Sequence, residues 1–157
     1  MVTIIIADQL SKGAIQSNYY LGESTKVIDG LFSITYVRNT GAAFGMGAGA
    51  SEIWRRILFL AIPTLVCFFL LYYIIKNIKG PLHMALAYSL ILAGAIGNLI
   101  DRYILGYVVD MFDFYINTSH FPAFNIADSA ITVAGVIIVF DIFFNKEDKK
   151  ADVKLSS

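Results

Sequence analysis

The chain is organised around residues 94–129, a stretch that holds three polar motifs: Gly94-Ala95-Ile96-Gly97-Asn98-Leu99-Ile100-Asp101-Arg102, Val108-Val109-Asp110, and Phe121-Pro122-Ala123-Phe124-Asn125-Ile126-Ala127-Asp128-Ser129. Four of the twelve acidic residues of the protein fall inside this stretch. The motifs stand at the ends of two very apolar segments. A carboxylate close to lipid is costly, so its presence here predicts a functional site.

The composition is that of a membrane protein. Hydrophobic residues make up 57% of the 157 positions, charged residues only 15%, and the mean hydropathy is +0.68. These values lie outside the usual range of soluble domains. The formal net charge is zero and the basic residues are scattered, which gives no indication of a nucleic-acid surface. The single cysteine, Cys67, supplies neither a disulfide framework nor a metal site of the Cys/His type.

Three segments are long and apolar enough to cross a bilayer. We predict transmembrane helices over residues 54–76, 82–102 and 124–144. The first contains Pro63, a residue type that kinks helices. The short connection after it forces the next helix to run back antiparallel. Residues 145–157 form a charged tail that we expect to be disordered.

Residues 1–18 are interpreted as the end of a first membrane helix. The apolar run of residues 2–7 would rise only about 10 Å as a helix, against a hydrocarbon core of about 30 Å. Either this segment lies at the interface, or the front of a first transmembrane helix is missing. Asp8 and Lys12 share one face of a helix, so they can form an ion pair.

Residues 19–53 have a different pattern. β-branched and aromatic residues before Arg38, with a turn signal at Asp29-Gly30, predict one or two short strands outside the bilayer. The glycine-rich loop of residues 39–47 lacks the Gly-Lys-Ser/Thr ending of a phosphate-binding loop. Its glycines suit tight turns or a backbone placed near a ligand. The predicted fold is therefore mainly α, with a small β-structure outside the membrane.

The connectivity places the polar motifs on one side of the membrane. Residues 103–123, a longer and partly amphipathic loop, lie on the same side as the predicted strands. The lysine-rich tail and the short loop at residues 76–81 lie on the other side. The positive-inside rule makes that second side cytoplasmic, although several arginines stand on the outer side. We expect the polar motifs near the outer face.

Helical periodicity aligns the polar residues into two stripes. Gly94, Gly97, Asn98 and Asp101 share one face of the second span, because they are spaced at i, i+3, i+4 and i+7. A similar stripe begins the third span and consists of Asn125, Asp128, Thr132 and Gly135. The glycines permit close approach of helices, so the stripes are expected to face each other. Asp110 would fold over them from the connecting loop, with Arg102 neutralising part of the charge.

The residue types narrow the chemistry to paired carboxylates. His83 lies at the opposite end of its helix and His120 stands alone, so a metal triad is not credible. Ser129 has no histidine placed as its base. Two aspartates that share a proton can activate water for proteolysis, and they can also relay protons in a transporter. A purely structural membrane subunit is a third reading, and it leaves the aspartates unexplained.

Five blocks of sequence resemble the motif set of one family, the bacterial lipoprotein signal peptidase or signal peptidase II. In addition to the three motifs already quoted, they are Asp8-Gln9-Leu10-Ser11-Lys12 and Asn39-Thr40-Gly41-Ala42-Ala43-Phe44-Gly45. The blocks occur in the family's order and cover nearly the whole chain. The resemblance implies a single-domain, four-helix aspartyl protease of the inner membrane with an extracytoplasmic β-cradle over residues 19–53. Such an enzyme removes the signal peptide of prolipoproteins just before a diacylglyceryl-modified cysteine.

The resemblance also implies roles for individual residues. Asp110 and Asp128 would be the catalytic pair, one acting as general base on water and the other polarising the scissile carbonyl. Substrate-binding or supporting positions would be Asp8, Lys12, Asn39, Gly41, Gly94, Asn98, Asp101, Arg102 and Asn125. Among these, Gly94, together with Gly97, would let the substrate helix approach. Asp113 and Asp141 match no essential block and are expected to be solvated or near the inner interface.

The partners implied by the resemblance are diacylglyceryl-modified prolipoproteins and membrane lipid. The family acts without a metal or other cofactor, and we expect the chain to function as a monomer. The expected location is the bacterial inner membrane, with the active site near the extracytoplasmic face.

Overall fold

The computed structural model describes residues 1–41 and 51–155, and side chains up to residue 144. The elements follow in the order α1 (Val2–Asn18), β1 (Ser24–Ile28), β2 (Phe32–Asn39), α2 (Glu52–Arg56), the π-helical turn η2 (Ile57–Ala61), α3 (Ile62–Lys76), α4 (Leu82–Ile104), β3 (Val108–Ile116), β4 (Ser119–His120) and α5 (Ile126–Leu155). Most of the predicted glycine-rich loop, residues 42–47, lies outside the described residues.

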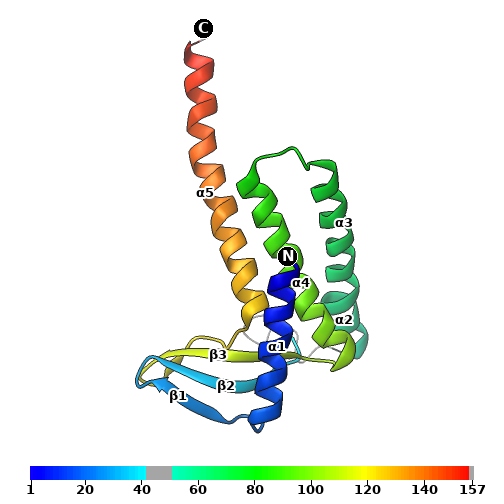
Figure 1. Cartoon of the computed structure of the whole chain (residues 1–157), viewed down its shortest axis with the longest axis vertical. Helices are drawn as coiled ribbons and strands as arrows, with labels where there is room; N and C mark the ends of the chain where they lie inside the picture. Colours follow the sequence, from blue (N-terminus) through cyan, green and yellow to red (C-terminus); the bar gives the residue numbers. More distant parts are fainter. Residues whose placement is uncertain (42–50, 156–157) are drawn as a thin grey trace.

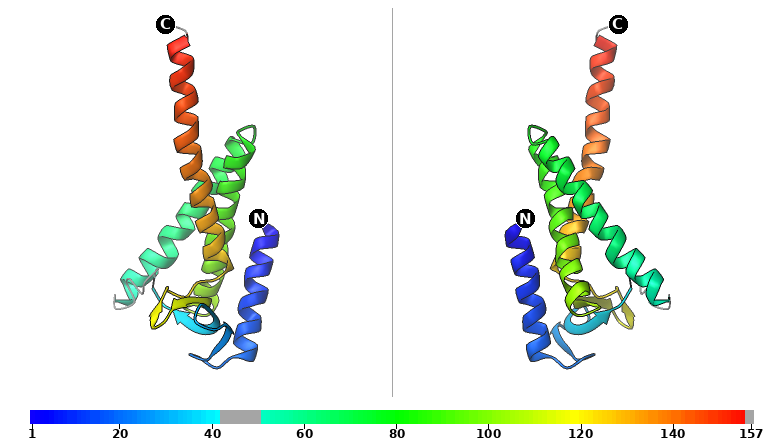
Figure 2. Two further views of the ribbon diagram at one scale, coloured as in Figure 1. Left: turned by 90° about the vertical axis from the view of Figure 1, so that its left-hand side faces the viewer. Right: turned by 90° about the vertical axis from the view of Figure 1, so that its right-hand side faces the viewer.

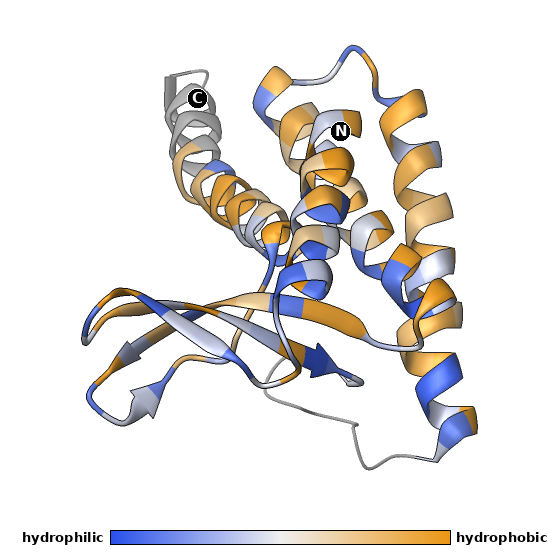
Figure 3. Ribbon diagram, turned by 60° about the horizontal axis from the view of Figure 1, so that its bottom comes forward, coloured by the Kyte–Doolittle hydropathy of each residue, from blue (hydrophilic) through white to orange (hydrophobic). Residues whose placement is uncertain are grey.

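Three of the described helices are long and apolar enough to cross a membrane. They cover Glu52–Lys76, Leu82–Ile104 and Ile126–Phe144, close to the three predicted spans. None of the residues of α3 is buried, which suits a helix that meets lipid on its sides. Figure 3 shows these helices dominated by hydrophobic colours, whereas hydrophilic residues gather where the helices meet the sheet. The prediction of a mainly helical membrane protein with a small sheet is confirmed.

Two details of the helices differ from the predictions. The π-helical turn η2 ends just before Pro63, so the wider helical turn falls where proline removes a backbone hydrogen bond. Helix α5 continues to Leu155, whereas the sequence analysis expected a disordered tail from residue 145. The added segment contains four lysines, which favour a helix, and has no Gly or Pro.

The sheet is antiparallel, with the strand order β1-β2-β3-β4. The β1–β2 hairpin turns at Gly30, whose φ of 77° is a conformation that glycine adopts without strain. The pairing of β2 with β3 sets Val37 opposite Asp110 and Phe32 opposite Phe114. The sequence analysis described residues 103–123 as an amphipathic loop, and this is wrong, because the segment contains β3 and β4. Asp110 therefore lies on a strand.

Helices and sheet meet at one end of the bundle. Figure 1 shows α1 descending onto the sheet beside α4 and α5, and Figure 2 shows α4 and α5 running side by side between α1 and α3. A hydrophobic core joins α1 to the sheet through Ile15, Tyr36, Val109 and Met111. Gly106, with a φ of 80°, ends α4 and turns the chain into β3. The motifs of residues 94–129 are thereby gathered at the junction.

Candidate active site

Asp128 lies in the first turn of α5, where it forms a cap with Asn125. The backbone N–H of Asp128 donates to Oδ1 of Asn125 at 2.9 Å, and the backbone N–H of Asn125 donates to Oδ2 of Asp128 at 3.3 Å. This reciprocal capping box satisfies two N–H groups that a helix start leaves without partners. The negative charge of the side chain also suits the positive end of the helix dipole. The local fold of α5 thus fixes the Asp128 carboxylate at the sheet end of the bundle.

Asp110 reaches the same point from β3. Its Oδ2 accepts a hydrogen bond from Nδ2 of Asn39 at 3.1 Å, and its Oδ1 accepts one from Nδ2 of Asn125 at 2.8 Å. The residue is only 2% exposed. Burial, followed by repulsion from the nearby Asp128 carboxylate, raises the pKa of Asp110 to about 7. The two aspartates therefore lie close enough to influence each other's charge.

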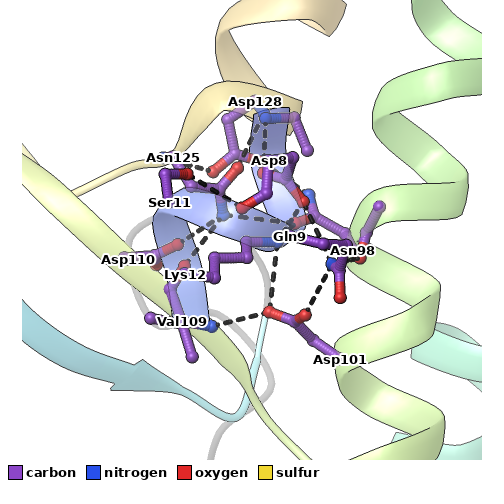
Figure 4. Close-up of polar contacts among 12 residues, drawn as sticks. Asp8, Gln9, Ser11, Lys12, Asn98, Asp101, Val109, Asp110, Asn125 and Asp128 are labelled. Carbon is purple, nitrogen blue, oxygen red and sulfur yellow. Dashed lines mark hydrogen bonds and ion pairs between the residues drawn. The ribbon is translucent and has the colours of Figure 1, made fainter. Parts of the chain in front are cut away.

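Asn98 connects α4 to this pair. Its Nδ2 donates to Oδ1 of Asp128 at 2.7 Å, while its Oδ1 accepts from Nζ of Lys12 at 3.1 Å and from Nδ2 of Asn125 at 3.2 Å. The ammonium group of Lys12 can only donate, so it fixes which end of the amide faces the aspartate. The predicted meeting of the two polar stripes takes place through this Asn98–Asp128 contact (Figure 4).

Lys12 is the centre of a buried cluster of charges. Its Nζ lies 2.8 Å from Oδ2 of Asp8 and 3.1 Å from Oδ2 of Asp101, and all three side chains are at most 3% exposed. The Asp8–Lys12 pair predicted from helical spacing is present, but it is buried, whereas an interfacial pair would be exposed. Removing one partner of such a cluster leaves an uncompensated buried charge, which is strongly destabilising.

The two carboxylates of this cluster also bind the backbone beside the catalytic candidates. Oδ1 of Asp8 accepts from the N–H of Ala127 at 2.9 Å, and Oδ2 of Asp101 accepts from the N–H of Val109 at 3.0 Å. Ala127 and Val109 are the residues that directly precede Asp128 and Asp110. Gln9, which the sequence analysis did not select, adds hydrogen bonds from its Nε2 to Asp101 and to the Gly97 carbonyl. Its place in the block Asp8-Gln9-Leu10-Ser11-Lys12 was the only signal.

Two further residues of the predicted site, Arg102 and Gly41, lie next to Asn39. Oδ1 of Asn39 accepts from the N–H of Gly41 at 3.0 Å, and the carbonyl of Gly41 accepts from Arg102 at 3.0 Å. Among the described contacts, no ion pair within 4 Å joins Arg102 to Asp128 or to Asp110. Its positive charge nevertheless lies close enough to attract both carboxylates. Arg102 thus orients the backbone next to Asn39.

Gly94 and Gly97 face the protein's own helices, which corrects the expectation that they receive the substrate helix. A Cβ at Gly94 would collide with the carbonyl oxygen of Ala127 and with Ile131, both on α5. A Cβ at Gly97 would lie 2.7 Å from Oδ2 of Asp8 on α1. The space beside both glycines is therefore filled by α5 and α1. Their small size brings the helices together.

Two side chains expected to stand apart have partners. Nδ1 of His120 lies 2.9 Å from Oδ1 of Asp113, across the hairpin formed by β3 and β4. The description of His120 as isolated and of Asp113 as solvated is therefore wrong, because strand pairing brings them together. At the far end of the bundle, Nε2 of His83 on α4 lies 2.5 Å from Oδ1 of Asp141 on α5.

The two catalytic candidates line a cavity of about 960 Å³ between the sheet, α4 and α5. Asn39, Asn98 and Arg102 line it from the polar side. Its remaining wall is largely apolar and includes Phe121, Pro122, Phe124, Ile131 and Val133. Two carboxylates sharing one proton in such a cavity can act as a base and an acid toward one bound substrate. The apolar wall suits a substrate with hydrocarbon groups.

Comparisons with known proteins agree with this arrangement. The family model described as signal peptidase (SPase) II matches residues 1–144. The lipoprotein signal peptidase of Syntrophus aciditrophicus is 43% identical over 146 residues, covering 93% of this chain and 91% of that protein. The one from Shewanella pealeana is 47% identical over 153 residues, covering 97% and 89%. A bacterial membrane enzyme solved by the in meso method at 2.3 Å resolution superposes with a TM-score of 0.84 at 37% identity, covering 94% of this chain and 87% of that one.

Proposed function

Because this chain belongs to the signal peptidase II family, we propose that it cleaves the signal peptide from lipoprotein precursors, using Asp110 and Asp128 as an aspartic catalytic pair. Cleavage would fall on the N-terminal side of a diacylglyceryl-modified cysteine. The observation that carries the proposal is the convergence of both carboxylates on Asn125, at the wall of a largely apolar cavity that both aspartates line.

The charge states follow from the surroundings of Asp110. A pKa of about 7 means that this carboxyl is mostly protonated below neutral pH and loses its proton as the pH rises through about 7. Asp128 accepts hydrogen bonds from Asn98 and from the backbone of Asn125, so its oxygens are placed to receive a proton. We therefore assign Asp110 as the acid and Asp128 as the base, while the proton belongs to the pair as a whole.

The reaction would proceed by attack of water on the scissile carbonyl carbon. Asp128 removes a proton from the water as the new C–O bond forms, and Asp110 gives its proton to the carbonyl oxygen. When the tetrahedral intermediate collapses, the C–N bond breaks and the leaving amine takes the proton held by Asp128. The remaining hydroxyl proton returns to Asp110 as the carboxylic acid product forms, so the pair ends as it began.

The substrate would lie along the cavity, with its acyl groups against the apolar wall around Phe121 and Val133. We expect the enzyme to act as a monomer. The three spans support a multi-pass membrane enzyme, and we propose the bacterial inner membrane as its location.

The decisive experiment compares Asp110→Asn and Asp128→Asn with the unaltered protein. A diacylglyceryl-modified prolipoprotein in detergent, with a chelator present, is the substrate. Both variants should fall to background, because an amide neither stores the shared proton nor accepts one from water. Asp113→Asn is the matched control, since Asp113 lies on the same strand but bonds to His120 outside the site. A near-normal rate in either of the first two variants would show that the pair is wrongly assigned.

A further inference from the structure

Arginines gather at the sheet end of α2 and α4, and two of them, Arg55 and Arg56, have no role in the proposed reaction. Arg55 and Arg56 of α2, with Arg102 of α4, line a cavity of about 520 Å³ between these two helices. Glu52 is the only acidic residue among the described lining. Figure 1 shows that α2 and the end of α4, which line the cavity, lie at the sheet end of the bundle. It borders the candidate active site, with which it shares Thr40 and Arg102.

The arginines retain capacity to bind an anion. Each guanidinium carries five N–H donors. Arg55 donates from Nε to the carbonyl of Thr40 at 3.2 Å, and Arg56 pairs with Glu52 at 2.6 Å. The side chains of that ion pair are 72% and 76% exposed. An exposed pair within one helix contributes little stability, so a phosphate can replace the carboxylate of Glu52.

A second cavity continues from the first into the membrane-spanning region. It has a volume of about 480 Å³, lies between α3 and α4, and shares Tyr103 with the arginine-lined cavity. Oγ1 of Thr64 and the hydroxyl of Tyr103 meet at 2.9 Å on its rim. The rest of its lining is apolar and includes Phe68, Leu71 and Leu92. From residue 92 to residue 103, α4 rises about 16 Å, which is close to half of a hydrocarbon core of about 30 Å.

We propose that these two cavities together bind one anionic phospholipid of the surrounding bilayer. Its phosphodiester would contact Arg55 and Arg56, and an acyl chain would fill the cavity between α3 and α4. Arginine forks bind phosphate through paired hydrogen bonds, and basic pockets between membrane helices are suited to anionic head groups. A zwitterionic lipid carries its own cation, which the arginines repel. The bound lipid would hold α2 against α4, independently of any cleavage.

Trp54 provides a direct probe, because it is the only tryptophan of the chain and directly precedes Arg55. The full chain is reconstituted in phosphatidylcholine vesicles that contain a small fraction of lipid whose acyl chains are brominated next to the glycerol backbone, close to the head group, where the bromines quench tryptophan on contact. Brominated phosphatidylglycerol should quench Trp54 several-fold more than brominated phosphatidylcholine at the same fraction. Equal quenching by the two lipids would overturn the proposal.

Paired variants test the head-group contact. Arg55→Gln combined with Arg56→Gln should abolish the preference for phosphatidylglycerol. Lys76→Gln combined with Lys79→Gln is the matched control, because it removes two charges at the opposite end of the same helical rod and should keep the preference. If the control loses the preference equally, general charge attraction explains it and the proposal fails.

A third variant should strengthen the preference for phosphatidylglycerol, whereas the arginine variant should remove it. Glu52→Gln removes the carboxylate that competes for Arg56, so the preference for phosphatidylglycerol should increase. A preference that stays the same or falls would contradict the assigned phosphate position. The far-ultraviolet circular dichroism of all variants should match that of the unaltered chain.

Discussion

Asn39 controls the charge of Asp110 from the end of β2. Its hydrogen bond to Oδ2 stabilises the ionised form and so lowers the pKa of Asp110, against the larger effect of burial, which raises it. Because the acid must be protonated, cleavage should decline as the pH rises through about 7. Asn39→Ala removes the donor, so the pKa of Asp110 should rise further and the alkaline limb of kcat/KM should move to higher pH.

The measurement is a pH profile of kcat/KM for both proteins with the same prolipoprotein. Asn39→Ala should also lower the maximum rate, because Asp110 loses one of the two amide side chains, those of Asn39 and Asn125, that donate to it. Asn18→Ala is the control, since Asn18 is exposed and bonds only within α1 in the described contacts. If the alkaline limb of Asn39→Ala moves to lower pH or stays in place, Asn39 does not lower the pKa of Asp110.

Individual residues were predictable where the contact is local or the motif is distinctive. The Asp8–Lys12 pair follows from a spacing of four on a helix, and the Asn98–Asp128 contact follows from two stripes on facing helices. The bond from Lys12 to Asn98 joins residues 86 positions apart, and that from Ala127 to Asp8 joins residues 119 apart. No periodicity encodes such pairs, because they depend on how whole elements dock.

Among the elements, β3 shows where a pattern fails. A half-buried strand alternates apolar and polar residues, but Val108, Val109, Asp110 and Met111 are all buried. The first half of the strand is buried on both faces, so it shows no such alternation. Asp110, a charged residue within this half, also favours the prediction of a loop. The membrane helices were predictable because their length and uninterrupted hydropathy need no tertiary information.

Helices α4 and α5 can pack closely because residue 94 is a glycine and has no Cβ. A Cβ there would collide with the Ala127 carbonyl, a backbone atom that cannot rotate away, and with Ile131. Gly94→Ala should therefore push the helices apart and cost about 1–3 kcal/mol of stability. The same shift would separate Asn98 from Asp128, so cleavage should fall as well.

The matched control for this variant is Gly135→Ala, because a Cβ at Gly135 meets nothing within 4 Å. Alanine favours a helix over glycine by about 0.5–1 kcal/mol, so this control should be neutral or slightly stabilised. Thermal unfolding in detergent and the cleavage rate are measured for both. A Gly94→Ala protein that unfolds and cleaves like the Gly135→Ala protein would show that the helices tolerate the methyl group.

In the whole molecule, α1, α4, α5 and β3 converge on one buried network. Lys12 joins the first two helices, while Asp8 and Asp101 bind the backbone directly before Asp128 and Asp110. The charged cluster therefore positions the two catalytic candidates by their main chain, whereas the asparagines position them by their side chains. This division explains why five separate sequence blocks must come together before either aspartate is placed.

The arrangement also predicts which side of the membrane carries the sheet. Lys76 and Lys79, with the lysines of α5 beyond residue 144, lie at the end of the bundle away from the sheet. The positive-inside rule assigns that end to the cytoplasm, so the candidate active site should face outward. Single cysteines in a Cys67→Ala background test this, with Lys26→Cys on β1 and Asn77→Cys beyond α3. Both positions are exposed to solvent or interface.

A membrane-impermeant maleimide added to intact spheroplasts should label Lys26→Cys and leave Asn77→Cys unlabelled until the membrane is permeabilised. The physical reason is that the uncharged helix between residues 57 and 75 separates the two positions, and the reagent cannot cross the hydrocarbon core. Reversed labelling would place the sheet in the cytoplasm, where Asp110 and Asp128 would not meet exported precursors. Labelling of both positions in intact spheroplasts would show that the helix of residues 52–76 does not span the bilayer.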